Sequence, residues 1–162
     1  MMNLATIKKG YLAVSDRIYI VVRSLCKLLL LIMTLSVSYA FVGRFIIKKT
    51  PSWCEELGIL CMVWVGLLSS ALAIRDGIHI RMTVINYIFS DKVCKTMHFC
   101  SYVVLLILNI VWVKYGVQVI SLTFRTKMTA LQLPQSVLYG SVAVVGVIGI
   151  VMTLARMVKG EW

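Results

Sequence analysis

Few residues in this chain have types and spacing suited to chemistry. The five cysteines form no C-x-x-C pair, and the two histidines show no ligand spacing with them, so we expect no metal site. No serine or cysteine has an evident basic partner, and no glycine-rich loop suits a phosphate. We therefore expect no catalytic residue, no enzyme activity and no bound cofactor, with the cysteines serving as small packing residues.

The paired carboxylates Glu55 and Glu56 begin a long apolar stretch. Ser52 and Glu55 have the S-x-x-E spacing of a capping box, in which both side chains accept free backbone N–H groups at a helix start. From Leu57 to Ile74 no charged residue follows. About 20 such residues, at 1.5 Å each, cross a hydrocarbon core about 30 Å thick. The sequence therefore predicts a transmembrane helix over residues 55–75, with Arg75 at its end.

The whole composition is that of a membrane protein. The chain has 162 residues, of which 60% are hydrophobic and 14% charged. Apolar stretches predict an all-α membrane protein with four transmembrane helices at about residues 28–47, 55–75, 99–124 and 137–155. We expect one integral membrane domain over residues 1–162. The formal net charge of +11 does not indicate nucleic acid, because the basic residues lie between apolar stretches and form no continuous face.

Two polar segments are predicted beside these crossings. Residues 1–27 combine basic residues with apolar ones near helical spacing, which is typical of an amphipathic helix lying on an anionic leaflet; a disordered basic tail is the alternative. A cleaved signal peptide is rejected because the basic region is too long. Residues 78–98 are amphipathic but too polar to span, so we expect an interfacial helix between crossings two and three.

A stripe of small residues runs along the second crossing. Gly66, Ser70, Ala73 and Gly77 follow at intervals of four, three and four, so they share one helix face. Small residues allow close helix contact in lipid. The stripe predicts either an interface with another subunit or close packing within the chain's own bundle.

The distribution of basic residues predicts the orientation. Eleven of the 17 lie in segments on the side of the amino terminus and six on the other side, so we expect both termini in the cytoplasm. No crossing carries a carboxylate at its centre, which disfavours an ion pathway within this chain. Lys114, predicted in the outer half of the third crossing, is expected to reach Glu55 or Glu56, with Arg44 as a competing cation. The alternative is that Lys114 extends to the outer headgroups.

In this order, these residues resemble the small (DctQ-type) membrane subunit of tripartite ATP-independent periplasmic (TRAP) transporters. The resemblance covers most of the chain and depends on W-x-E-E at the start of the second helix, W-x-G within it, R-x-x-x-H-I at its inner end and Leu-Pro before the last helix. The matching residues are Trp53, Glu55, Glu56, Trp64, Gly66, Arg75, His79, Ile80 and Pro134. Members often carry an acid soon after the histidine, where this chain has Arg81-Met82-Thr83.

The resemblance implies a multi-pass subunit of the bacterial inner membrane. It would bind no substrate or sodium itself but brace a large, elevator-type, sodium-coupled subunit, while a periplasmic binding protein delivers an organic acid such as a C4-dicarboxylate or a sialic acid. Arg75 and His79 are then expected to anchor the inner end of the second helix, with Arg75 on phosphate or the helix's terminal carbonyls.

Two other classes of protein remain as alternatives. A haem- or quinone-binding anchor of a respiratory complex would use His79 and His98 as axial ligands, but both fall in a polar segment rather than inside a crossing. A small multidrug exporter would need a buried carboxylate in its first crossing, and residues 28–47 contain none.

Overall fold

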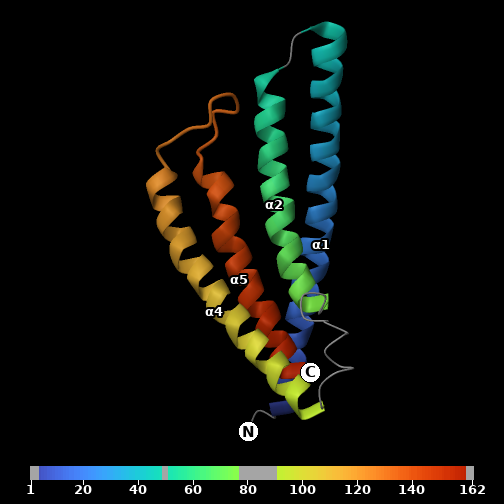
Figure 1. The fold of residues 1–162 in the computed structure, drawn as a ribbon, viewed down its shortest axis with the longest axis vertical. Coiled ribbons are helices and arrows are strands. Elements are labelled where there is room, and N and C mark those ends of the chain that lie inside the picture. Colours follow the sequence, from blue (N-terminus) through green and yellow to red (C-terminus); the bar gives the residue numbers. More distant parts are fainter. Residues whose placement is uncertain (1–3, 49–50, 77–90, 160–162) are drawn as a thin grey trace.

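The structure is a computed structural model that describes residues 4–48, 51–76 and 91–159. Its elements are α1 (Leu4–Val42) with a π-helical turn (Gly43–Ile47), α2 (Ser52–Asp76), α4 (Asp91–Thr123) and α5 (Ser136–Lys159), as Figure 1 shows. Each contains a segment long and apolar enough to cross a membrane. The predicted all-α membrane fold with four crossings is confirmed.

The first crossing is longer than the sequence predicted. α1 continues without interruption from Leu4 to Val42, so the basic amino-terminal segment and the apolar stretch form one helix. The physical reason is local: no proline or glycine occurs between Tyr11 and Val42 to end a helix. The described part of the amphipathic segment predicted over residues 1–27 is therefore helical and continuous with the first crossing, while its place on an anionic leaflet stays a prediction.

The start of α4 corrects a second boundary. Residues 77–90 of the predicted interfacial helix lie outside the described residues, whereas residues 91–98 belong to α4, which begins at Asp91. Between Asp91 and Phe99 there is again no proline or glycine. The polar segment therefore continues directly into the third crossing.

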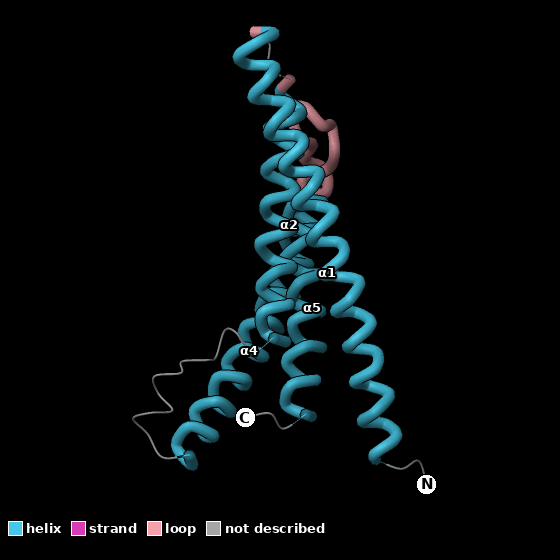
Figure 2. The backbone as a smooth tube through the Cα atoms, turned by 90° about the vertical axis from the view of Figure 1, so that its right-hand side faces the viewer, coloured by secondary structure: helices cyan, strands magenta, loops and turns pink. Residues whose placement is uncertain are grey.

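The helices form two antiparallel hairpins, α1 with α2 and α4 with α5 (Figures 1 and 2). Among the described elements α5 contacts all three other helices, α2 packs between α5 and α1, and α4 packs against α5 alone. The end of the bundle with Lys48, Pro51 and residues 124–135 is called the loop end. The opposite end, where α1 begins and α5 finishes, is called the terminal end (Figure 2). At the loop end the α1/α2 hairpin extends beyond α4 and α5 (Figure 1).

The buried core joins α1, α2 and α5. Its central cluster consists of Val22, Cys26, Leu68, Ala71 and Val145. Cys54 and Cys61 are also buried, as expected for small packing residues, whereas Cys100 is exposed and does not fit that expectation. This cluster fixes the relative heights of the three helices, because residues in one buried cluster lie at similar positions along the bundle.

Candidate functional site

At the loop end, Glu56 connects α2 to the segment before α5. The backbone N–H of Ala130 donates to its carboxylate oxygens at 2.9 and 3.0 Å, and the N–H of Leu131 donates to Oε2 at 2.8 Å. Carboxylates that accept several backbone N–H groups form strong, charge-assisted hydrogen bonds. Glu56 therefore holds this loop against the start of α2, a role that the sequence did not predict.

The loop that Glu56 holds is a short hairpin. The N–H of Met128 donates to the Leu133 carbonyl at 2.8 Å, and the N–H of Gln135 donates to the Thr126 carbonyl at 2.8 Å. Gln132 has a φ of 55°, the left-handed conformation that closes the turn. Pro134 pairs with Lys127 across the hairpin, and its carbonyl accepts the N–H of Val137 at 3.0 Å. Pro134 thus lies at the entrance to α5.

The other carboxylate, Glu55, joins α2 to α1. Its Oε1 lies 3.7 Å from Nη2 of Arg44, and nearby the rings of Tyr39 and Trp53 stack at a centroid distance of 5.9 Å. The helix begins at Ser52, so Glu55 lies inside the first turn and its carboxylate faces Arg44. Trp53 and Glu55 therefore both attach the start of α2 to the end of α1.

These contacts overturn the predicted pairing of Lys114. Its ammonium lies 5.9 Å from the centroid of the Tyr115 ring on its own helix, while Glu55 and Glu56 have the partners given above. The physical reason is the order of the helices, since α5 separates α4 from α2. Arg44, the competing cation considered from the sequence, is the residue that pairs with Glu55.

At the terminal end, Arg75 joins α2 to α1. It forms an ion pair with Asp16, donates to the Ser15 carbonyl at 3.3 Å, and lies with Cζ 4.2 Å from the centroid of the Tyr19 ring. The Tyr19 hydroxyl donates to Oδ2 of Asp76 at 3.2 Å. The anchoring role expected for Arg75 fits these contacts, but its partners are on α1 rather than phosphate or the carbonyls of its own helix. His79 lies outside the described residues.

The same part of α1 also contacts α5. The Tyr11 hydroxyl donates to the Val151 carbonyl at 2.9 Å, and the Ser15 hydroxyl lies 3.5 Å from the Met152 sulfur. Ser15 is buried. Residues 10–19 of α1 are therefore part of the bundle, a fact that their basic, amphipathic composition did not indicate.

The middle of α2 contains the remaining predicted residues. The Trp64 indole N–H donates to the Val137 carbonyl of α5 at 3.1 Å, and the Ser70 hydroxyl donates to the Leu67 carbonyl of its own helix at 2.7 Å. Gly66 is exposed, and a Cβ at this position would meet nothing within 4 Å. Packing within the chain's own bundle does not explain why a glycine lies at position 66. The alternative, an interface with another subunit, stays a prediction.

Among the described glycines, those with the least free space around them lie between α4 and α5. A Cβ at Gly116 would lie 2.8 Å from the backbone nitrogen of Ala143, and one at Gly146 would lie 2.8 Å from Cγ2 of Val113. Buried Asn109 fills the space beside Gly149 while its amide donates to the Leu105 carbonyl at 2.7 Å. The glycines of the fourth crossing were visible in the sequence, but their partners Gly116 and Asn109 were missed.

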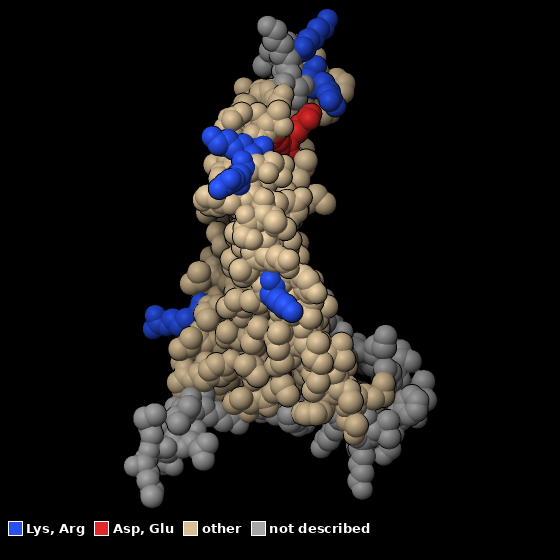
Figure 3. All heavy atoms as spheres, turned by 90° about the vertical axis from the view of Figure 1, so that its left-hand side faces the viewer, with Lys and Arg blue, Asp and Glu red and all other residues tan. Residues whose placement is uncertain are grey.

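No group of three or more His, Cys, Asp or Glu side chains comes together in the part of the chain that the structure describes. His98 is half-buried near the start of α4. Charged groups are sparse on the face seen in Figure 3, and most of those drawn lie toward the loop end.

Comparison with protein families identifies the family of this chain. A family model for the DctQ component of tripartite ATP-independent periplasmic transporters matches residues 33–161. The chain belongs to this family. It is therefore a small component of a TRAP transporter, and its four apolar helices make it a multi-pass membrane protein.

The extent of the match adds a structural point about this DctQ-family chain. The match begins within α1, so Tyr11, Ser15, Asp16 and Tyr19 precede it although they contact α2 and α5. Comparison with curated proteins gives no match to this sequence. The contacts of residues 10–19 are thus a feature of this chain's structure that the family match does not cover.

Proposed function

We propose that this chain is the bracing subunit of a sodium-coupled TRAP transporter that imports an organic acid of the sialic acid or C4-dicarboxylate class. In this role it binds neither substrate nor sodium. It holds the large, elevator-type subunit in the bacterial inner membrane while a periplasmic binding protein delivers the substrate. Both termini, and hence the terminal end, face the cytoplasm, and the loop end faces the periplasm.

The contacts that the carboxylates make between elements support a bracing role. Each of the four carboxylates whose side chains the structure describes makes a contact that fastens one element to another. Asp16 and Glu55 pair with arginines across α1 and α2, Asp76 accepts the Tyr19 hydroxyl, and Glu56 holds the loop before α5. All four lie toward the ends of the bundle. Such an arrangement suits a static frame, because carboxylates of ion pathways lie within the membrane.

Uptake by reconstituted proteins tests this role. Liposomes containing the large subunit, with binding protein and substrate outside, should show sodium-driven uptake when this chain is present and none when it is omitted. This chain alone should support no uptake. If the large subunit and binding protein transported at full rate without this chain, a bracing role would be excluded.

A second measurement separates bracing from substrate selection. Replacing both Arg75 and His79 by alanine should lower the yield of assembled complex, while the ranking of substrates by the complex that remains should be unchanged. A change in substrate preference without loss of assembly would contradict the proposed division of labour.

A further inference from the structure

The register of α4 against α5 sets the depth of Lys114. The contacts of Gly116 with Ala143, Gly146 with Val113, and Gly149 with Asn109 follow one antiparallel register. Lys114 adjoins Val113, so its backbone lies beside the part of α5 around Gly146.

This part of α5 is the middle of its crossing. Val137 to Ala155 carries no charged residue, and a helix of this length rises about 28 Å, close to the roughly 30 Å of a hydrocarbon core. Gly146 lies about 14 Å from either end of that stretch. Lys114 therefore lies beside the middle of the α5 crossing, not in the outer half that the sequence predicted. A lysine side chain reaches about 6 Å, less than the roughly 14 Å from Gly146 to either end of that stretch.

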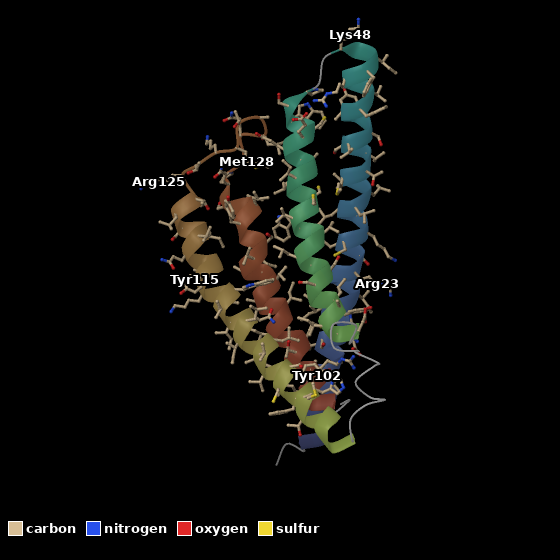
Figure 4. The ribbon with its side chains drawn as sticks, in the orientation of Figure 1. Arg23, Lys48, Tyr102, Tyr115, Arg125 and Met128 are labelled. Atoms are coloured by element: carbon tan, nitrogen blue, oxygen red, sulfur yellow. The ribbon has the colours of Figure 1, made fainter. Side chains whose placement is uncertain are left out.

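The side chain of Lys114 faces away from the bundle. Lys114 is exposed, and among the described elements α4 packs against α5 alone. The adjacent Tyr115 is 56% exposed and points outward in Figure 4. The exposed residues of α4 around it are mostly apolar, with Ile107, Ile110, Val111 and Val117, and include one polar residue, Gln118. Lys114 is thus a cation on a largely apolar outer surface.

The described part of the chain supplies no anion for Lys114. Asp16, Glu55, Glu56 and Asp76 have the partners given above, at the ends of the bundle. An unpaired charge facing hydrocarbon is costly, so charges within membranes are generally paired. The counter-charge must therefore come from outside this part of the chain.

Arg23 and Lys27 of α1 differ from Lys114 although they are also exposed. Arg23 lies on the opposite flank at about the height of Tyr115 (Figure 4). Both α1 cations close a segment that also carries Asp16 and Arg17, so uncharged sequence, Leu28 to Gly43, flanks them on one side only. Lys114, by contrast, has uncharged sequence on both sides, from Phe99 to Val113 and from Tyr115 to Phe124.

We propose that the outer face of α4 around Lys114 docks a transmembrane helix of the large TRAP subunit, and that a carboxylate on that helix pairs with Lys114. This inference rests on the proposed function, which supplies the partner. A second copy of this chain fits the face poorly, because a symmetric contact would bring two ammonium groups together. A phospholipid phosphate fits poorly as well, because Lys114 lies far from both ends of the uncharged stretch of α5.

The test is co-purification of the two membrane subunits from membranes that express the full complex. Lys114→Glu should reduce recovery of the large subunit roughly tenfold or more, because it places a like charge against the partner carboxylate. Lys114→Arg should retain recovery. The matched controls Lys48→Glu and Lys127→Glu change exposed cations at the loop end and should leave recovery unchanged. Each variant is first purified alone, and only monodisperse variants are compared.

Rescue and cross-linking locate the contact. A lysine in place of one intramembrane carboxylate of the large subunit should restore recovery with Lys114→Glu. A photo-reactive residue at Val111 should cross-link to the large subunit. If Val111 gives no such product while Met62, exposed on α2 near Gly66, does, the docking face is the α2 stripe and the proposal is wrong.

Three further outcomes are distinct. Full recovery with Lys114→Glu, alongside normal recovery of the unaltered chain, would overturn the docking site and leave the bracing function intact. Failure of the unaltered chain to recover a large subunit would instead overturn the proposed function. If Lys114→Met removed a phospholipid retained by the isolated chain, seen by native mass spectrometry, but left subunit recovery unchanged, Lys114 would be a lipid site and the proposal would fail.

Discussion

The two hairpins of this molecule are held together by different physical means. In α1/α2, the ends are joined by long polar side chains, Arg44 with Glu55 and Arg75 with Asp16. In α4/α5, the helices approach through Gly116, Gly146 and Gly149, with little room for side chains between them. In lipid, close packing drives helix association, whereas ion pairs at the membrane edge are weakened by water. The comparison therefore places the more sensitive contact in α4/α5.

The largest expected effect follows from Gly116. Gly116→Val would place a branched side chain against the backbone of Ala143, which cannot move without shifting α5. Overpacking of this kind costs about 1–3 kcal/mol and occasionally more. The variant should lose its monodisperse peak in detergent and show a lower midpoint of thermal unfolding.

Gly66→Val is the matched control for Gly116, because Gly66 faces open space on α2. The isolated chain should tolerate it, with a change in unfolding free energy within about 0.5 kcal/mol. If Gly66→Val and Gly116→Val lowered the unfolding free energy equally, Gly116 would not be more tightly packed than Gly66.

A smaller effect is expected at the terminal end of α1/α2. The Arg75 side chain is 20% exposed and that of Asp16 is 54% exposed. A double-mutant cycle with Arg75→Gln and Asp16→Asn should give a coupling free energy of about 1 kcal/mol, the upper range for exposed pairs. The cycle is measured by reversible denaturation in detergent, and a coupling near zero would remove Asp16 as a partner.

The effect of Glu56 should be local. Glu56→Gln lacks one carboxylate oxygen and the negative charge, so it cannot accept both N–H groups of Ala130 and Leu131 as strongly. Hydrogen exchange of these two amides should become faster, while amides in the middle of α5 keep their protection. Unchanged exchange at both positions would show that the loop holds its shape without Glu56.

The smallest effect is expected for Arg44 and Glu55. Their side chains are 68% and 59% exposed and the N–O distance is 3.7 Å. Exposed pairs of this kind contribute roughly 0–0.5 kcal/mol. A double-mutant cycle with Arg44→Gln and Glu55→Gln should therefore show less coupling than the cycle at Arg75 and Asp16. The reverse order would contradict the stronger attachment assigned to the terminal end.

Sequence alone determined the class of this protein and its helical crossings. Uncharged stretches such as Leu57–Ile74 and Val137–Ala155 must satisfy their backbone groups internally, and length and composition suffice to predict membrane helices. The order of motifs around Trp53, Trp64 and Arg75 indicated the DctQ family, which the family match over residues 33–161 confirmed. These features are local or depend on order along the chain.

Tertiary structure decided which helices meet and which way their polar groups face. Apolar composition does not reveal that α5 contacts the other three helices, that Gly116 is tightly packed and Gly66 open, or that Lys114 is exposed on α4 beside the middle of α5. The predicted pair of Lys114 with Glu55 or Glu56 failed because α5 lies between their helices. Side-chain pairing depends on helix order and register, which arise from packing between segments distant in sequence.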